Sequence, residues 1–349
     1  MSRAISMAIV VLLVLSLVPL SLRAQNEVNH PINPSSNNPA VMPAKISKDV
    51  QADTSTRTIP VSVFQMGSPK EPLPISDLTA ADFELRVRGT PPVRAASFRR
   101  GLTRMVILFD VGRNQTQSEW KTAVAISTRL AENLPDGSEL NLVSFSDRVE
   151  QVVSTGTDRR KLIDILHGLG PTSKDSNEGA LLAALERGAQ LLEPARLGDV
   201  EVFFLNAPVT GTRSGQKEDA IGSQFSGSGV RALGIVLDDP GMRSPGLSTP
   251  TAATVTDHPE LFSASERLAV ATGGMFVSFR PDASEQVSSR QQENVASLIN
   301  ALATNYYSLT VDCSSLRRAE RAQVKLKNKK LAATSFLSYP TMLYPCAGH

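Results

Sequence analysis

The stretch MVILFD at residues 105–110 indicates the fold class, because five consecutive apolar residues lead directly into an acid. A continuous apolar run of this kind is typical of a parallel strand that is buried on both faces. Further strand candidates at 140–145, 200–205 and 230–237, which are mostly apolar, alternate with amphipathic segments. This alternation predicts an α/β fold with a doubly wound, mainly parallel sheet over residues 101–303.

The amphipathic segments between these strands are expected to be helices covering the sheet. They span residues 118–134, 159–167, 178–192, 261–271 and 292–303, with one further strand at 275–279. The helix at 178–192 is expected to have Ser176 as its N-cap, since serine is favourable at that position.

Two β-rich segments flank this region, at residues 49–100 and 304–349. Residues 83–87 and 322–327 alternate apolar and charged side chains, as half-buried strands do. Runs at 59–64, 306–311 and 335–339 are further strand candidates. We expect the two segments to pair into one small sheet beside the α/β domain.

The N-terminal region predicts export. Arg3 precedes an apolar run over residues 8–22, which has the length of a signal-peptide core, and Ala24 is a plausible last residue before cleavage. The alternative is an uncleaved N-terminal anchor. Residues 25–48 are rich in Asn, Pro and Ser and predict a disordered linker. The mature chain is therefore expected to be secreted or periplasmic.

The two cysteines, Cys313 and Cys346, both lie near the C-terminus. In an oxidising compartment they could form a disulfide, which would stabilise the fold by roughly 3–4 kcal/mol in the chain-entropy model. The alternative is two unpaired thiols.

Composition and motifs argue against several classes of function. The formal net charge of +2 and the single Trp give no support to nucleic-acid binding. The sequence contains no phosphate-binding loop, no nucleophile elbow and no zinc-protease motif. The four histidines, at positions 30, 167, 258 and 349, have no metal-ligand spacing. We therefore expect neither an enzyme nor a bound cofactor.

Four short motifs in a fixed order resemble von Willebrand factor type A (vWA) domains, in particular the exported acidobacterial vWA-related proteins. They are LTAADFEL at 78–85, the 105–110 strand with its terminal Asp110, the turn Thr272-Gly273-Gly274, and NYYSL at 305–309. The resemblance covers nearly everything after the linker. It implies a vWA fold between β segments, and a protein-binding, adhesion-type function.

The resemblance also implies a divalent-cation site at the carboxyl edge of the sheet, where open α/β sheets bind ligands. Its first loop has the family pattern Asp-x-Ser-x-Ser. This sequence keeps Asp110 but has Gly112 and Asn114 where the serines belong. Glycine offers no side-chain oxygen, and asparagine is neutral, so the first loop is degenerate as a site for a hard cation.

The other two loops of this site depart from the pattern as well. Asn206 stands where the family has an Asp, which removes another charge. The loop that should supply a Thr is ambiguous in register, with Thr172 as first choice and Ser176 as second; Asp175 could add a carboxylate if it turns inward. We therefore expect no metal, with Mg²⁺ at Asp110 as the alternative.

The densest charge cluster is basic and lies between residues 317 and 330. Its members are Arg317, Arg318, Arg321, Lys325, Lys327, Lys329 and Lys330. Since the lysines alternate with Val324 and Leu326, they predict the solvent face of a strand that is protected from edge pairing. A polyanion-binding patch is the alternative.

These observations favour a non-enzymatic module that binds a protein partner. The candidate surface comprises the loops at 110–114, 172–176 and 206–210. A structural component of the cell envelope, in which the β segments make the contacts, is the alternative. Membrane contact is expected only if the N-terminal segment is not cleaved.

Overall fold

The computed structural model describes residues 56–65, 72–87, 93–113, 116–205, 215–237, 264–279, 285–314 and 316–346. The expected signal peptide and linker, residues 1–48, lie outside these ranges, as do Asn114 and Asn206. No helix in the ranges described is long and apolar enough to cross a membrane.

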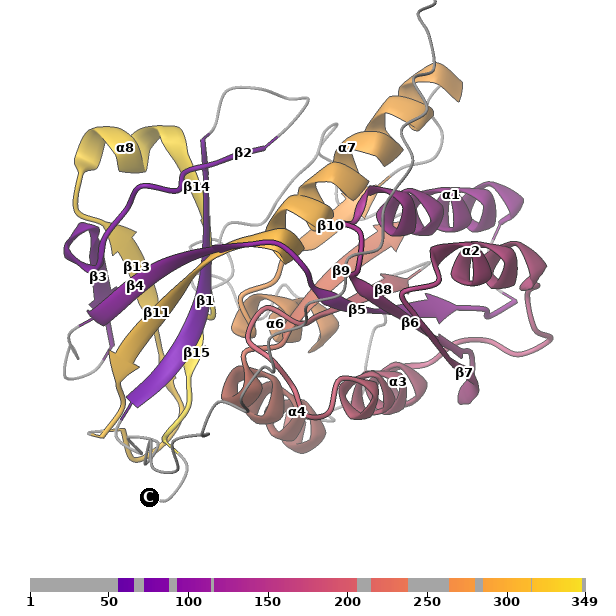
Figure 1. Cartoon of the computed structure of the whole chain (residues 1–349). Helices are drawn as coiled ribbons and strands as arrows, with labels where there is room; N and C mark the ends of the chain where they lie inside the picture. The colour runs from indigo at the N-terminus through magenta and orange to yellow at the C-terminus, as the bar shows by residue number, and fades with distance from the viewer. Residues whose placement is uncertain are drawn as a thin grey trace, which may run out of the picture. The chain divides into compact units, whose positions relative to one another are not determined.

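The centre of the fold is a six-stranded sheet in the order β10-β9-β8-β5-β6-β7 (Figure 1). Its strands are β5 (Arg104–Asp110), β6 (Glu139–Phe145), β7 (Val149–Gly156), β8 (Val200–Leu205), β9 (Arg231–Leu237) and β10 (Phe276–Phe279). Every residue of β5 is buried, as the 105–110 run predicts for a central strand.

The sheet is mixed rather than uniformly parallel. Strands β5, β6, β8, β9 and β10 pair in parallel, whereas β7 returns antiparallel to β6. The turn that connects β6 to β7 is short, and a short connection between neighbouring strands can only form an antiparallel pair. Among the described residues, all strand pairs outside this sheet are antiparallel. The predicted α/β fold is therefore confirmed, but the structure as a whole is mixed and not mainly parallel.

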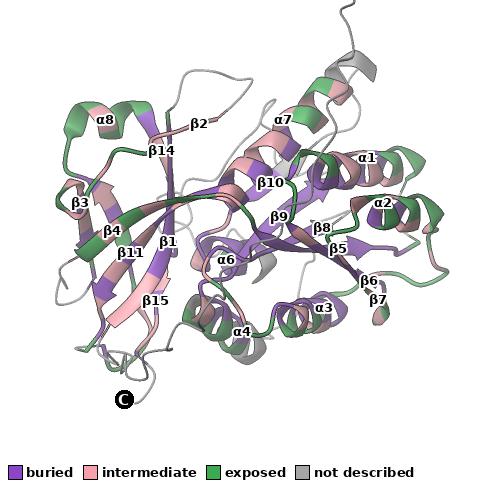
Figure 2. Cartoon of the chain, viewed as in Figure 1, coloured by how far each residue is buried: buried purple, intermediate pink, exposed green. Residues whose placement is uncertain are grey.

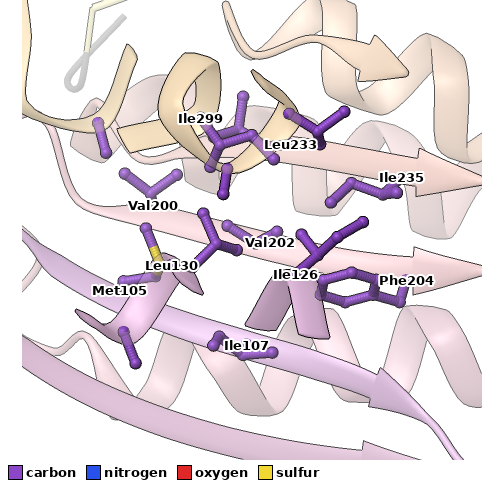
Figure 3. Packing of buried hydrophobic residues seen from close by; sticks show 14 of the residues in the cluster. Met105, Ile107, Ile126, Leu130, Val200, Val202, Phe204, Leu233, Ile235 and Ile299 are labelled. Carbon is purple, nitrogen blue, oxygen red and sulfur yellow. The ribbon is translucent and has the colours of Figure 1, made fainter. Parts of the chain in front are cut away.

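Helices cover both faces of the sheet (Figure 1). One face packs against α1 (Gln117–Asn133), α2 (Arg159–Gly168) and α7 (Glu285–Thr304). The other packs against α3 (Glu178–Leu191), α4 (Gly215–Ser228) and α6 (Ala264–Ala271). Figure 3 shows the first core, in which Ile126 and Leu130 of α1 meet Val202 and Ile107. The central strands β5, β6 and β9 are therefore almost entirely buried, whereas the edge strand β7 is largely exposed or half-buried.

The remaining strands form a second unit, which we call the β module. The longer strands are β1 (Thr56–Gln65), β4 (Val93–Arg100), β11 (Asn305–Asp312) and β14 (Ser335–Ser338), paired in the order β14-β1-β11-β4. The shorter elements are β2 (Leu73–Pro74), η1 (Ala80–Asp82), β3 (Phe83–Arg86), β12 (Glu320–Arg321), β13 (Gln323–Leu326), α8 (Lys329–Thr334) and β15 (Met342–Leu343). The expected pairing of N- and C-terminal β segments is confirmed by β1 lying antiparallel to β11.

The β module has its own apolar core, and the cysteines belong to it. Tyr307 packs edge-on against Phe83, with ring centroids 5.2 Å apart. Cys313 and Cys346 are both buried and lie at disulfide-bonding distance, with Cα atoms 5.7 Å apart. The predicted pairing is therefore supported by geometry, and it connects the end of β11 to the tail beyond β15.

The turn Thr272-Gly273-Gly274 is a contact point between the central domain and the β module. Gly273 has φ +78°, and a Cβ there would lie 2.6 Å from Pro340. A Cβ on Gly274 would lie 1.7 Å from the carbonyl oxygen of Ala232. The close approach of two backbones, rather than ligand binding, explains the glycines at this turn.

Candidate functional site

Asp110 ends β5 at the carboxyl edge of the central sheet, where its side chain is only 4% exposed. Its Oδ1 accepts a hydrogen bond from the Gly112 backbone N–H at 2.8 Å and a second, short one from the Ser176 hydroxyl. Charge-assisted hydrogen bonds of this kind are the strong ones in proteins. The carboxylate therefore holds its own loop and a second loop together.

Backbone hydrogen bonds join three loops around this carboxylate. Val111 N–H donates to Phe145 at 2.8 Å, and Thr172 N–H donates to the Val111 carbonyl at 2.7 Å. Arg113 N–H donates to the Lys174 carbonyl at 2.9 Å, and Asn177 N–H to Ser146 at 3.4 Å. The loop after β5, the loop after β6 and the segment leading into α3 are thus joined by hydrogen bonds into one surface, which we call the rim.

Helix α3 begins at Glu178 as expected, but its N-cap lies one residue later than predicted, which determines what Ser176 can do. The N-cap is Asn177, whose side-chain oxygen accepts from Ala180 N–H at 2.9 Å. Ser176 is therefore not the N-cap, and its hydroxyl is directed to Asp110 instead. The error has a physical basis, because serine and asparagine are about equally good N-caps.

The two other candidates in this loop do not reach Asp110. The Thr172 hydroxyl interacts with the backbone of Lys174, at 3.3 Å. Asp175 does not turn inward: it forms a two-pronged ion pair with Arg113, with both N–O distances 2.9 Å. The guanidinium holds the pKa of the Asp175 carboxyl below its usual range.

The side chains described here are a poor match for a hard divalent cation. They supply one carboxylate and one hydroxyl, which are hydrogen-bonded to each other, while Gly112 offers only its backbone. Mg²⁺ requires near-octahedral oxygen ligation with several charged or water ligands. Among the described residues no group of three or more His, Cys, Asp or Glu side chains could hold a metal. Asn114 and Asn206 fall outside the described ranges.

Sequence reasoning missed several contributors to this rim. Ser146 is fully buried and its hydroxyl donates to Glu150 at 2.7 Å, which secures the turn after β6. Trp120 packs edge-on against Phe109, with centroids 5.2 Å apart, beneath the Asp110 loop. Thr116 and Glu119 form a capping box at the start of α1, and its Thr-x-x-Glu spacing could have been recognised in the sequence.

Besides Arg104 and Asp110 of β5, the central sheet carries the buried ionisable residues Glu201 and Arg231, which do not belong to the Asp110 loops. Glu201 on β8 is fully buried under Gly188 of α3, and neither carboxyl oxygen has a hydrogen-bond partner. Burial raises the pKa of Glu201 well above its usual value. Arg231 on β9 lies 5.1 Å from the Tyr306 ring centroid, and burial lowers its pKa to about 10.

A comparison with protein families matches residues 105–205 to the von Willebrand factor type A domain. The match runs from β5 to β8 and so includes the strand that ends at Asp110 and the whole loop up to Ser176. A comparison with curated proteins finds no match.

Solved structures similar to the chain include three proteins of low sequence identity. The von Willebrand factor type A protein from Catenulispora acidiphila is 9% identical with TM-score 0.41, over 84% of this chain and 74% of that one. Proximal thread matrix protein 1 from the mussel byssus is 13% identical with TM-score 0.41, over 62% of this chain. BatB from Bacteroides thetaiotaomicron is 11% identical with TM-score 0.38, over 56% of this chain and 97% of that one. The chain spans half the length, 50%, of the mussel protein.

Proposed function

The chain contains a von Willebrand factor type A domain, and from that premise we propose that it is a protein-binding module of the adhesion type. In this proposal the module works outside the cytoplasm and contacts its partner through the loops at the carboxyl edge of the sheet. The metal-ion-dependent adhesion site is degenerate, so the partner is held without a metal bridge. The module has no catalytic activity.

The observation that carries the proposal is the pairing of Asp110 with Ser176. In a metal-bridged site, the first-loop carboxylate must offer its oxygens to the cation or its waters. Here Oδ1 already accepts two hydrogen bonds, and Gly112 adds no side-chain ligand. The buried carboxylate thus has a structural role, which is to fix the loop geometry.

The resulting rim is suited to binding a protein. Its loops are joined by backbone hydrogen bonds, so little conformational freedom remains to be lost when a partner binds. The Arg113–Asp175 pair is exposed, with side-chain exposures of 62% and 54%, and presents both signs of charge. Such a pair contributes little to stability, but it can confer orientation and specificity on an interface.

Location outside the cytoplasm is supported by the cysteine pair. Disulfides persist in secreted and periplasmic proteins and are rare in reducing compartments. Both cysteines are buried and within bonding distance. The apolar segment at residues 8–22 agrees with export, and membership of the exported acidobacterial vWA-related group is part of this proposal.

The proposal is tested by capturing partners from an envelope extract of the source cells with the oxidised chain. Arg113→Glu and Asp175→Lys each reverse one charge of the rim and should abolish specific capture, whereas EDTA should have no effect. The double variant R113D/D175R restores the ion pair with its two charges exchanged. If capture returns, the ion pair itself is what the partner needs; if capture stays lost, the partner needs each charge in its original position. The matched control reverses Arg187, which is exposed on α3 away from the rim, to Glu.

A structural role in the cell envelope is the second candidate, favoured by the marked positive charge of the β module. In that case capture would survive both rim variants. It would be lost instead when residues between Leu326 and Tyr339 are changed.

A further inference from the structure

Charge is distributed unevenly over the chain. The whole sequence has 36 Lys and Arg against 34 Asp and Glu, a formal net charge of +2. The described strands and loops of the β module alone contain twelve Lys and Arg against five Asp and Glu. The rest of the chain is therefore net negative. A local excess of this kind attracts anions, although the whole-molecule charge conceals it.

Four lysines concentrate this charge on one side of the β module, and we call them the lysine face: Lys325, Lys327, Lys329 and Lys330. Strand β13 buries Val324 and Leu326, so Lys325 lies on its outer side. Lys327 directly follows the strand and is exposed, about 7 Å from Lys325 at the usual strand rise. Lys329 and Lys330 follow directly at the start of α8, which is largely exposed (Figure 2).

The acids nearest to the lysine face are hydrogen-bonded to other groups but still interact with two of the lysines. Glu84, opposite Lys325 on β3, accepts from Arg86 Nε at 2.7 Å. The hydrogen bond from Arg86, and then the charges of Arg86, Lys325 and Lys327, lower the pKa of Glu84. Asp82 accepts from the backbone and hydroxyl of Thr79, both at 2.8 Å. The hydrogen bonds from Thr79, and then the charge of Lys327, lower the pKa of Asp82. Among the residues the structure describes, none of the four lysines has an ion-pair partner. Their ammonium groups are exposed or half-exposed.

We propose that the lysine face is a second binding surface, separate from the Asp110 loops, and that it binds an acidic polysaccharide outside the cell. Four flexible ammonium groups along a strand and the following helical turn can each neutralise one carboxylate of a linear polyanion. They need no fixed geometry, because lysine is a point charge on a long stem. Binding displaces counterions from the polymer, so its free energy depends strongly on salt.

Other anionic partners fit the surface less well. Nucleic-acid binders without sequence preference stack bases on exposed aromatic side chains. Of the β-module tyrosines, Tyr307 and Tyr339 are buried, while Tyr306 and Tyr344 are half-buried, and none of the four belongs to the lysine face. The exposed large apolar side chains of the described residues are Leu73 and Leu102, neither of which belongs to the lysine face, so there is no apolar anchor for a membrane.

The test measures binding of the oxidised full chain to polygalacturonate by isothermal titration calorimetry over a series of salt concentrations. The wild type should bind with a slope of log K against log salt of roughly −2 to −4, as expected for a few released counterions. The variant K325Q/K327Q/K329Q/K330Q should lose at least tenfold in affinity and most of this slope. If this variant fails to fold, the triple variant K327Q/K329Q/K330Q, which changes only the exposed lysines, replaces it in the same measurement.

The matched control is R148Q/R160Q/K161Q/R187Q, which removes four exposed positive charges from the central domain. It should bind like wild type. Equal loss in this control would show that only net charge matters and would overturn the proposal, as would wild-type affinity in the lysine variant. Stronger binding to vesicles of equal parts phosphatidylglycerol and phosphatidylcholine, or to single-stranded DNA, than to polygalacturonate would overturn the polysaccharide assignment.

Discussion

The hydroxyl of Ser176 donates a hydrogen bond to the buried carboxylate of Asp110 and thereby joins the loop before α3 to the end of the central strand β5. The two residues are 66 positions apart in the sequence, so the bond closes a long loop at the edge of the sheet. Because Asp110 is almost fully buried, this partner also compensates for its desolvation.

Removing that hydroxyl should destabilise the domain. Ser176→Ala leaves Asp110 with one fewer donor, and a hydrogen bond to a charged group contributes about 1.5–3 kcal/mol. We expect a decrease of this size in the free energy of unfolding, measured by urea denaturation. Ser176→Thr retains the hydroxyl and should be close to wild type. If S176A and S176T lose the same amount, the hydroxyl is not what matters.

Glu201 should make stability depend on pH. Its pKa is raised in the folded chain, so the folded state binds this proton more tightly than the unfolded state. The stabilisation is complete below the ordinary pKa near 4.5 and is lost as pH rises from there toward the folded-state pKa, by up to about 1.4 kcal/mol per pH unit. The neutral variant Glu201→Gln should lack this decline.

The measurement for Glu201 is the midpoint of urea unfolding at pH 5 and at pH 8. The free energy of unfolding of wild type should fall between pH 5 and pH 8, and that of E201Q should not show this fall. E201Q should therefore be more stable relative to wild type at pH 8 than at pH 5. Glu186→Gln, an exposed glutamate on the same side of the sheet in α3, is the control and should follow wild type. Parallel pH profiles for wild type and E201Q would contradict the account.

The glycine turn at 272–274 should not tolerate side chains. Gly274→Ala places a Cβ 1.7 Å from the Ala232 carbonyl oxygen, so the backbones of β9 and the turn must separate. We expect a loss of several kcal/mol, or failure to fold, because the atom that the new Cβ meets is a backbone oxygen, which cannot move aside as a flexible side chain could. Gly227→Ala, in α4 with nothing within 4 Å, should be neutral or slightly stabilising. Circular dichroism melting curves of the two variants decide between these outcomes.

Much of the fold could be predicted from sequence, because burial on both faces makes β5 a continuous apolar run from Met105 to Phe109 and leaves β8 and β9 apolar apart from Glu201, Arg231 and a glycine. The antiparallel return of β7 was missed, since residues 149–156 (VEQVVSTG) neither form a continuous apolar run nor alternate strictly. The pairing of β1 with β11 joins segments some 250 residues apart, and only the alternation of side chains pointed to it.

The candidate site was predicted less completely. Asp110 was found through the resemblance of its strand and loop to those of vWA domains, but Ser176 ranked below Thr172. Three adjacent residues, Asp175, Ser176 and Asn177, can all cap a helix, so local propensity does not fix the register. Tertiary contacts settle it: Asn177 N–H bonds to Ser146, Asp175 pairs with Arg113, and only Ser176 faces the carboxylate.

The proposed function requires that the Asp110 loops hold a partner without a metal. Titration of the full chain with Mg²⁺ and Mn²⁺ by isothermal calorimetry tests this requirement. We predict no saturable binding at micromolar to low millimolar concentrations, with identical traces for wild type and Asp110→Ala. Micromolar affinity for either cation that disappears in Asp110→Ala would contradict the claim.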